Sequence, residues 1–277
     1  MNLEGKVAVV TGAGSGMGRQ IAIQLAHKNV SVAAIDINPD SLKETISLIN
    51  EFSGKASAYV ANIADKDRVA KLPEEIIANY GVIDILINNA GIIQPFVTVS
   101  ALTLAQIERV FNVNLFGNVY MTKAFLPYLK NRPEAYLVNV SSMGAFVPVP
   151  GQVIYGASKA AIQLLTEGLM SELHDTPVKV TIVFPGAVNT NIAQNAPDIT
   201  KADLAQMASS AKAGEASTTS APEAARQIVR AIEKNQPRLY IGNDSKMMNF
   251  MSRLSPKMAS DTIRTQMKKM IGPIKDA

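Results

Sequence analysis

Apolar runs and helical patterns alternate along the whole of this chain. Seven short, mostly apolar runs are separated by longer segments in which apolar residues recur every three or four positions. Several runs are apolar throughout, as is typical of parallel strands that are buried on both faces. The pattern predicts an α/β fold, a doubly wound parallel sheet of about seven strands with helices on both faces. The predicted strands are Lys6–Val10, Val30–Ile35, Ala56–Val60, Ile83–Ile87, Tyr136–Val140, Val178–Val183 and Arg238–Ile241.

The size of the chain fits one such domain. Of 277 residues, 47% are hydrophobic and 18% are charged, which is a normal balance for a globular protein with a large core. We expect one domain over residues 1–243 and a helical extension, not a separate domain, over residues 244–277. No apolar run approaches the roughly 18 residues that span a bilayer, and the first residues show no signal-peptide pattern. We therefore expect a cytoplasmic protein.

Composition excludes several kinds of site. The chain has no cysteine, and its two histidines, His27 and His174, lie far apart. Disulfides and thiolate metal sites are therefore excluded, and we expect no metal ion and no histidine-based catalytic triad. Residues 244–277 account for the whole net charge of +4, so the preceding residues are neutral overall. We therefore expect no nucleic-acid partner.

A glycine-rich turn, TGAGSGMG over residues 11–18, joins the first predicted strand to a helical pattern. Glycines at such a turn let the backbone approach a pyrophosphate, which then lies at the helix N-terminus. The spacing differs from the more common G-x-G-x-x-G, and an ordinary tight turn is the alternative. In this strand–turn–helix context the segment predicts a dinucleotide site. The residues expected to contact the cofactor are Gly12, Ser15, Gly16, Met17 and Gly18.

The second predicted strand ends at Asp36, about twenty residues beyond the glycines, where an acid can bond the adenosine ribose hydroxyls and repel a 2′-phosphate. No basic residue follows it, since Ile37 is next, and none lies among the glycines. The sequence therefore predicts NAD in preference to NADP. The alternative, that Asp36 caps the next helix, is weakened because Asn38 or Asp40 can take that position.

Candidate chemistry gathers around Ser142, Tyr155 and Lys159. In a helix, Tyr155 and Lys159 lie one turn apart on one face. A neighbouring ammonium lowers the pKa of a phenol from about 10 toward the working pH, where acid–base catalysis is most efficient. Ser142 follows a predicted strand, and its hydroxyl can hold a carbonyl or alcohol oxygen near the phenol. A solvent-exposed Tyr–Lys pair on a helix surface is the alternative.

Taken together, these motifs resemble the short-chain dehydrogenase/reductase family, in its compact single-domain branch with a Rossmann-type fold. The resemblance runs from Lys6 to about Gly242. Besides the glycine turn, it rests on residues that occur in order at familiar spacing, namely Asn88, Asn89, Ala90, Gly91, Asn114, Ser142, Tyr155, Lys159, Pro185 and Gly186. In combination they favour a catalytic pair over a surface pair.

The resemblance implies a role for each catalytic residue. Tyr155 exchanges a proton with the substrate oxygen while a hydride passes between substrate and nicotinamide. Lys159 lowers the pKa of Tyr155 and bonds the nicotinamide ribose. Ser142 orients the substrate oxygen, and Asn114 holds a water that links Lys159 to solvent. A loop-bracing or helix-capping role is the alternative for Asn114.

The resemblance also implies further cofactor contacts. Asn88 is expected near the adenosine ribose and pyrophosphate, or as a stabiliser of the central sheet. One departure is visible, since Asn62-Ile63 stands where the family has Asp followed by Val or Leu. The Asn62 carbonyl oxygen can still accept from the adenine amino group. The remaining expected contacts are Ile63, Asn89, Ala90, Gly91, Pro185, Gly186, Val188 and Thr190, besides Tyr155 and Lys159.

The substrate pocket is expected between Ile93–Val97, Met143–Gly151 and residues 186–213. The first two segments carry no Arg or Lys that could hold a carboxylate. The expected contacts are mostly apolar and predict a hydrophobic secondary alcohol or ketone as substrate. They are Ile93, Phe96, Ser142, Met143, Val149 and Tyr155.

Two largely apolar segments, Asn114–Leu129 and Gln152–Leu173, are read as helices with both faces buried. In relatives the corresponding helices form a dimer face, so we expect a homodimer or homotetramer.

Three functions compete at this point. The first is an NAD(H)-dependent alcohol dehydrogenase or carbonyl reductase, to which an NADPH-dependent carbonyl or 3-oxoacyl reductase is the alternative within the same class. The second is an NAD-binding scaffold or sensor without catalysis, which has no need of Asn114, Ser142, Tyr155 and Lys159 together. The third is an epimerase or dehydratase of the longer related branch, whose glycine turn has a different spacing.

The extension over residues 244–277 reads as two helices, with Asp244 capping the first and Ser255-Pro256 starting the second. One apolar stripe contains Met247, Met248, Met251 and Leu254, and the other contains Ala259, Ile263, Met267, Met270 and Ile271. Packing on the body or on a second subunit beside the substrate pocket is favoured. Membrane-surface attachment and a disordered tail are the alternatives.

Overall fold

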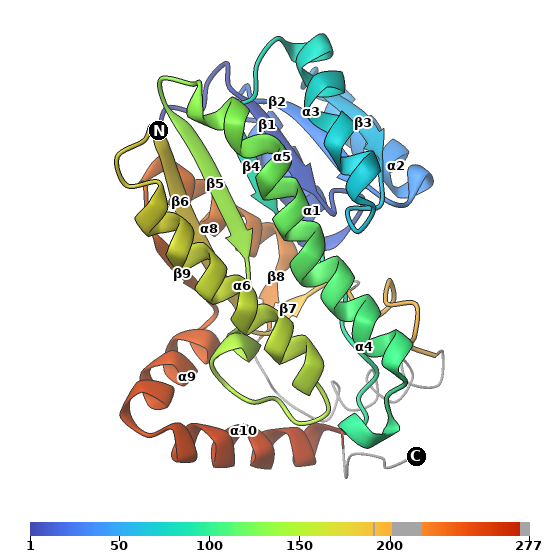
Figure 1. Ribbon diagram of the computed structural model, residues 1–277, viewed down its shortest axis with the longest axis vertical. Helices are drawn as coiled ribbons and strands as arrows, with labels where there is room; N and C mark the ends of the chain where they lie inside the picture. Colours follow the sequence, from blue (N-terminus) through green and yellow to red (C-terminus); the bar gives the residue numbers. More distant parts are fainter. Residues whose placement is uncertain (191, 201–217, 272–277) are drawn as a thin grey trace.

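The computed structural model describes residues 1–190, 192–200 and 218–271, and of 269–271 the backbone alone. Its centre is a seven-stranded parallel sheet in the order β3-β2-β1-β4-β5-β6-β9 (Figure 1). All seven predicted strands are confirmed, with bounds that shift by no more than two residues. The strands are β1 (Val7–Thr11), β2 (Ser31–Asp36), β3 (Ala56–Val60), β4 (Ile85–Asn88), β5 (Ala135–Val140), β6 (Val178–Pro185) and β9 (Arg238–Ile241).

Helices cover both faces of this sheet (Figure 1). Helices α1, α2 and α8 pack on one face, where Ile21, Leu42 and Ile228 belong to one buried cluster. Helices α3, α5 and α6 cover the other face, where Leu72 and Phe125 are fully buried. Burial on two sides explains why the central strands are apolar throughout. The described helices are α1 (Gly16–Ala26), α2 (Pro39–Asn50), α3 (Lys66–Tyr80), α4 (Leu104–Phe111), α5 (Asn118–Lys130), α6 (Val153–Glu172), α8 (Ala221–Glu233), α9 (Asn243–Leu254) and α10 (Pro256–Ile271).

Side-chain caps fix where several helices begin. Asn38 Oδ1 accepts the N–H of Ser41 at 3.0 Å, and Pro39 takes the first position of α2. Asn38 is therefore the cap, and Asp36 is left to other contacts. Ser220 Oγ accepts the N–H of Glu223 in the same way at the start of α8.

Two features between the predicted elements were missed. A π-helical segment, Asn112–Gly117, joins α4 to α5, so the predicted helix over Asn114–Leu129 begins inside it. A two-stranded parallel pair, β7 (Val188–Asn189) with β8 (Thr219–Ser220), lies beyond the end of β6. Neither feature is long enough to give a hydrophobic period of its own.

The C-terminal extension forms two helices that pack on the body of the domain. Met248, Ala259, Ile263 and Met267 are buried in one cluster with Val147. The predicted stripe of α9 is only half right, because Met247 and Leu254 are exposed while Met248 and Met251 face inward. The side chains of Met270 and Ile271 lie outside the described residues.

The predicted caps of these helices are confirmed in one case and wrong in the other. Ser255 Oγ accepts the N–H of Met258 at 3.3 Å at the start of α10. Asp244 does not cap α9, because its carboxylate turns away and accepts the N–H of Ala187 at 2.6 Å. None of the described helices combines the length and apolar character of a membrane span.

Candidate active site

A cleft of about 970 Å³ lies at the carboxyl ends of the parallel strands. Gly12, Asp36, Asn89, Ser141 and Pro185 line it, each at or just beyond the end of a different strand. The strand order reverses between β1 and β4, which is where ligands bind in open α/β sheets. Apart from Asn88, the residues predicted to contact the cofactor line this cleft, namely Gly12, Ser15, Gly16, Met17, Gly18, Asp36, Ile37, Asn62, Ile63, Asn89, Ala90, Gly91, Tyr155, Lys159, Pro185, Gly186, Val188 and Thr190.

The glycine turn depends on backbone shapes that side chains would prevent. Gly12 has a φ of +67° and Gly16 a φ of +52°, in the left-handed region that glycine adopts most readily. A Cβ on Gly18 would overlap the carbonyl oxygen of Gly12, so glycine lets α1 approach the end of β1. Helix α1 therefore begins directly at the cleft, with unpaired N–H groups suited to a pyrophosphate.

Asp36 lies beside this turn with a partly exposed carboxylate. One carboxylate oxygen accepts the N–H of Gly14 at 2.9 Å, and the other accepts the N–H of Asn38 at 3.0 Å. Both oxygens keep lone pairs for a further donor. The carboxylate is therefore held at the adenosine end of the predicted site by the backbone of the glycine turn itself.

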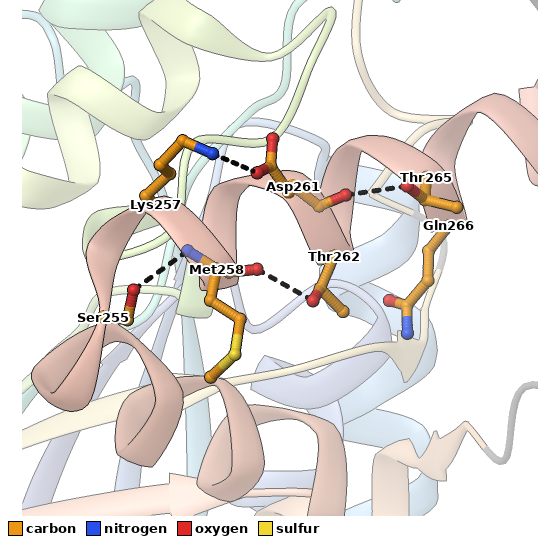
Figure 2. A pocket seen from close by; sticks show the side chains of 7 residues that line it. All are labelled: Ser255, Lys257, Met258, Asp261, Thr262, Thr265 and Gln266. Atoms are coloured by element: carbon orange, nitrogen blue, oxygen red, sulfur yellow. Dashed lines mark hydrogen bonds and ion pairs between the residues drawn. The ribbon is translucent and has the colours of Figure 1, made fainter.

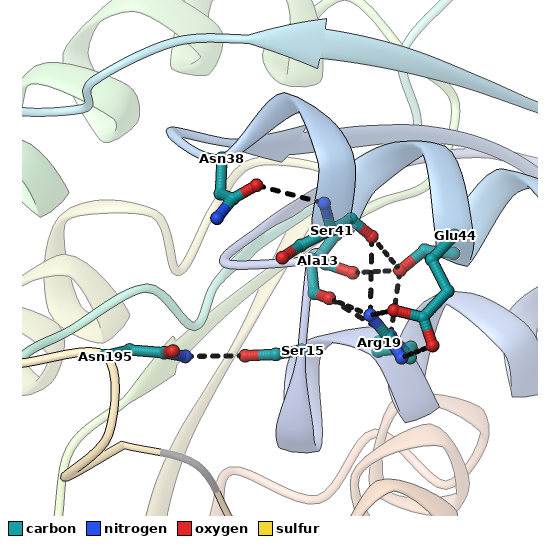
Figure 3. Close-up of polar contacts among 9 residues, drawn as sticks. Ala13, Ser15, Arg19, Asn38, Ser41, Glu44 and Asn195 are labelled. Atoms are coloured by element: carbon teal, nitrogen blue, oxygen red, sulfur yellow. Dashed lines mark hydrogen bonds and ion pairs between the residues drawn. The ribbon is translucent and has the colours of Figure 1, made fainter.

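Arg19, the cation nearest in sequence to the glycine turn, does not line the cleft and points toward Glu44 (Figure 3). Its guanidinium donates to the Glu44 carboxylate at 2.7 Å and to the carbonyl oxygen of Gly14 at 3.0 Å. The hydrogen bond and the charge of Arg19 hold the pKa of Glu44 below its usual value. Because Glu44 neutralises it, Arg19 braces the turn instead of offering charge to a phosphate.

Ser142, Tyr155 and Lys159 meet in the cleft, as predicted. Gly144 lies beside the side chains of Ser142 and Tyr155. A Cβ on Gly144 would lie 3.5 Å from Ser142 Oγ and 3.7 Å from the ring of Tyr155, so the Ser142 hydroxyl and the Tyr155 ring are close to each other. The Lys159 ammonium lies 5.9 Å from the centre of the Tyr155 ring. The surface-pair alternative is wrong, because Lys159 is almost wholly buried and Tyr155 is half-buried.

The pKa values of this pair differ from the sequence-based expectation. Burial raises the pKa of the Tyr155 phenol, and a hydrogen bond with Ser142 opposes the rise. Burial also lowers the pKa of Lys159 from 10.5 to about 8. The expected lowering of the pKa of Tyr155 by Lys159 is therefore not found, since loss of hydration is the larger effect on both groups.

Lys159 and Asn114 are held by polar contacts that converge near Gly91. Lys159 Nζ donates to the carbonyl oxygen of Val140 at 2.9 Å. The Asn114 amide bonds both the N–H and the carbonyl of Ile92, at 2.8 and 2.9 Å, and donates to Ser158 Oγ at 3.0 Å. A Cβ on Gly91 would lie 3.2 Å from both Asn114 Oδ1 and Lys159 Nζ. Asn114 thus braces the loop after β4, and its water-holding role stays a prediction.

Two asparagines make contacts that refine their predicted roles. Asn88 does not line the cleft, because it is buried between the sheet and α5 and donates to Asn139 at 3.0 Å and to Thr122 at 3.1 Å. Its sheet-stabilising alternative is therefore the correct one. Asn62 lines the cleft, and its Oδ1 accepts the N–H of Ala64 at 3.0 Å. That oxygen keeps a second lone pair for an adenine amino group.

The predicted substrate contacts divide into two groups. Ile93, Ser142 and Tyr155 line the cleft. Phe96, Met143 and Val149 do not line it, and instead pack against the cluster formed by α9 and α10. The part of the expected wall over residues 201–213 lies outside the described residues.

The predicted pocket wall over residues 186–213 is present in part, since residues 192–197 contribute to the lining of the cleft, but the polar contacts of this segment were not predicted. Asn195 Nδ2 donates to Ser15 Oγ of the glycine turn at 2.8 Å (Figure 3). Arg109 of α4 pairs with Asp198 at 2.7 Å, and Ile192 and Gln194 also line the cleft. These contacts join residues that are far apart in the chain, so no local sequence pattern predicts them.

A second hollow lies on α10 and is lined by Ser255, Met258 and five polar residues of that helix (Figure 2). Most of its polar groups are engaged in local hydrogen bonds of the helix. Lys257 Nζ donates to Asp261 at 3.3 Å, and Thr262 Oγ1 donates to the carbonyl of Met258 at 2.8 Å. It therefore offers no arrangement suited to catalysis.

Comparison with known proteins shows the family of the chain. A model of the short chain dehydrogenase family matches residues 6–201. The oxidoreductase SadH of Mycobacterium tuberculosis is 35% identical over 257 residues, which cover 91% of this chain and 92% of SadH. The 3-oxoacyl-[acyl-carrier-protein] reductase FabG of Thermotoga maritima is 34% identical over 72% of this chain and 80% of its own length.

Solved structures share the fold. A short-chain dehydrogenase/reductase from Burkholderia phymatum in complex with NAD superimposes with a TM-score of 0.80 at 23% identity, over 100% of this chain and 99% of that one. A short-chain dehydrogenase from Burkholderia cenocepacia in complex with NADP gives 0.75 at 28% identity, over 89% of this chain and 100% of that one. The chain therefore belongs to the short-chain dehydrogenase/reductase family of oxidoreductases.

Proposed function

We propose that this enzyme transfers a hydride between NAD(H) and a hydrophobic secondary alcohol or ketone, with Tyr155 as general acid and base. The observation that carries the proposal is that Ser142, Tyr155 and Lys159 share one cleft with the glycine turn and Asp36. An NAD-binding scaffold without catalysis has no use for a buried lysine beside a half-buried phenol, because burying that ammonium is unfavourable.

The residues that line the cleft fit a dinucleotide. The glycine turn offers unpaired N–H groups to a pyrophosphate, and Asp36 offers carboxylate oxygens to a ribose diol. Asn89, Ala90 and Gly91 complete the adenosine side, while Pro185, Gly186, Val188 and Thr190 form the nicotinamide side. When bound, the nicotinamide would supply or accept the hydride.

The protein's own part in the reaction is proton transfer and positioning. In reduction, the Tyr155 hydroxyl gives its proton to the substrate oxygen, and in oxidation the phenolate takes the proton back. The Ser142 hydroxyl orients that oxygen against the phenol. When protonated, Lys159 stabilises the phenolate, and burial strengthens this attraction by excluding water.

Asp36 supports a preference for NAD. A 2′-phosphate would meet its carboxylate at the end of β2. Among the described residues, the cations that line the cleft are Lys159 and Arg109, and Arg109 is paired with Asp198. A difference of about 1.4 kcal/mol already gives a tenfold preference. Because related structures hold NAD in one case and NADP in another, titration of the protein with NADH and NADPH decides the point. Tighter binding of NADPH would contradict the preference.

A second candidate is reduction of a 3-oxoacyl thioester, which the similarity to the Thermotoga maritima reductase favours. The reacting group is again a ketone beside an apolar chain, so the catalytic residues serve both substrates. Rates with simple ketones and with acetoacetyl thioesters, measured with both cofactors, separate the two candidates.

The proposed acid–base role is tested with Tyr155→Phe, which keeps the ring and removes the proton. Turnover should fall by at least about a hundredfold, while NADH binding is retained. Tyr80→Phe is the matched control, because the Tyr80 hydroxyl bonds the carbonyl of Val32 at 3.1 Å outside the cleft. Near-normal turnover by Tyr155→Phe would rule out the proposed mechanism.

A further inference from the structure

Helix α9 is apolar on two sides, and the part of the protein that the structure describes covers only one of them. Met248 and Met251 face inward. On the outer side, Met247, Phe250 and Leu254 recur every three or four residues and therefore form one stripe along the helix. Phe250 is 64% exposed and Leu254 is 66% exposed. Because helices that are apolar all round are normally buried all round, this outer stripe is suited to a second covering surface.

The stripe belongs to a larger patch of exposed apolar side chains. Four of the eleven large hydrophobic side chains that are exposed among the described residues lie between Met247 and Met258. Single exposed apolar residues are ordinary, whereas a group of them marks an interaction surface. Met258 lies in the first turn of α10, four residues beyond Leu254. The patch therefore continues around the corner between α9 and α10, at one end of the molecule (Figure 1).

A hollow of about 610 Å³ begins where the stripe ends. Ser255, the residue after α9, lines it together with Met258 and the following turns of α10 (Figure 2). Asp261 also lines it, and its carboxylate accepts from Lys257 at 3.3 Å and from Arg264 at 3.1 Å. A side chain of another protein can enter such a hollow, whereas an anionic bilayer surface would meet the Asp261 carboxylate there. The shape and charge of the hollow therefore favour a protein over a membrane.

Cations lie along one side of the stripe. Lys246 and Arg253 are seven residues apart, hence on one line of α9, and both are exposed. Within the described residues neither forms an ion pair, and Arg253 donates to Asn249 of the same helix at 3.3 Å. Asp244, the acid in the first turn of α9, instead accepts the N–H of Ala187. Positive charge without a neighbouring acid, beside an apolar stripe, is complementary to a partner that carries carboxylates there.

We propose that the outer face of α9 and the first turn of α10 bind an acidic, amphipathic helix of another protein. The stripe is one helix wide and about 18 Å long, which matches about three turns of a partner helix. Its acidic residues should lie about seven positions apart, opposite Lys246 and Arg253. A second copy of the chain is disfavoured, because residues 244–277 carry a net charge of +4 and two such faces repel each other. The inference is independent of the proposed hydride transfer.

The test uses the full-length protein and a displayed library of helical peptides of about 18 residues. Each peptide has Leu, Phe or Met at every third or fourth position, and Glu, Gln or Lys at the positions that flank them. We expect selection to enrich Glu at flanking positions about seven residues apart. The selected helix should bind at least about tenfold more tightly than its copy with Lys at those positions, and this ratio should fall as salt rises. Enrichment of Gln or Lys, or of no helix, would overturn the proposal.

Variants of the protein assign the binding to this face. Phe250→Ser should weaken binding of the selected helix at least about tenfold. Lys246→Glu combined with Arg253→Glu should weaken it about tenfold and remove its salt dependence. Leu104→Ser is the matched control, because Leu104 is exposed to a similar degree at the start of α4, and it should keep the wild-type Kd. These exposed positions should change the melting temperature little. Binding that survives both changes on α9 would overturn the proposal.

Two further measurements distinguish the other possible occupants of the face. The wild-type protein should not sediment with vesicles of phosphatidylcholine and phosphatidylglycerol, and light scattering should give equal masses for the wild type and Phe250→Ser. Vesicle binding that Phe250→Ser abolishes would assign the face to a membrane. A smaller mass for Phe250→Ser would assign it to a second copy of the chain. Either result would overturn the proposal.

Discussion

Replacing Asp244 with alanine should weaken both the folded state and cofactor binding, because this carboxylate supports the loop after β6 from behind. Its Oδ2 accepts the N–H of Ala187 at 2.6 Å. A Cβ on Gly186 would overlap the carboxylate, so Asp244 lies directly against that residue. Pro185, Gly186 and Val188 line the cleft on the proposed nicotinamide side. The first turn of the C-terminal extension therefore holds part of the cofactor site.

The size of the effect follows from the kind of hydrogen bond that is lost. A hydrogen bond to a charged group contributes about 1.5–3 kcal/mol, and partial exposure to solvent places this one near the lower limit. We expect Asp244→Ala to lower the free energy of unfolding by about 1–1.5 kcal/mol. If the loop loses its position, the Kd for NADH should rise about three- to tenfold, since 1.4 kcal/mol corresponds to a factor of ten.

Urea unfolding and fluorescence titration with NADH measure the two quantities. Ser245→Ala is the matched control, because the Ser245 hydroxyl also ties α9 to β6, by donating to the carbonyl of Phe184 at 2.8 Å, but does not touch the loop. This variant should lose similar stability and keep its affinity for NADH. The reasoning is refuted if Asp244→Ala and Ser245→Ala bind NADH equally well.

Three further predictions concern the buried lysine, the exposed helix faces and the extension. Burial lowers the pKa of Lys159 to about 8 from 10.5, so between about pH 8 and 10 the unfolded chain binds more protons, and the free energy of unfolding should rise by about 2 kcal/mol. Urea unfolding at both pH values should show this rise in the wild type but not in Lys159→Met. An equal change of the free energy of unfolding in the two proteins would contradict the lowered pKa of Lys159. We also propose that a second copy of the chain covers α5 and α6, where Leu164 is 73% exposed, so Leu164→Glu should reduce the mass measured by light scattering. A wild-type chain that is already monomeric would rule this out. Removal of residues 244–277 should raise KM for bulky ketones, because α9 and α10 cover Phe96, Met143 and Val149, and should leave binding to anionic liposomes negligible throughout. Strong, salt-sensitive liposome binding by the full chain would instead favour attachment to a membrane surface.

The sheet was predictable because its signal is local. Each strand is a short, mostly apolar run bounded by turn residues. The central strands β1, β4 and β5 are buried on both faces, so their runs are apolar without alternation. Caps of α2 and α10 were also correct, since Asn38 and Ser255 act on residues three positions away. The prediction that Asp244 caps α9 was wrong for the opposite reason. Its partner, Ala187, lies in a different part of the chain, and a short-range capping rule cannot detect that competition.

The candidate site follows the same division. Glycine spacing and the Tyr155–Lys159 spacing are local, and they led to residues that all line one cleft. The pKa values were not predictable, because they depend on how much water the fold removes from each group. In the structure, burial outweighs the attraction expected between Lys159 and Tyr155. Gln94 Oε1 accepts the N–H of Tyr155 at 3.0 Å, and this contact is also invisible in the sequence because 61 residues separate the two.

The contrast between local patterns and contacts that are distant in sequence explains why the reaction class is easier to predict than the substrate. Asp36 ends β2 and Ser142 lies two residues beyond the end of β5, so the sheet alone places both residues at the cleft. The apolar cluster under α9 and α10, which does not line the cleft, instead combines Phe96, Val149 and the inner face of α10, which come from three distant parts of the chain. Their contact depends on how α9 and α10 pack, and α9 is in turn anchored to the cleft through Asp244. Substitutions in the extension should therefore change which ketones are accepted before they change the chemistry at Tyr155.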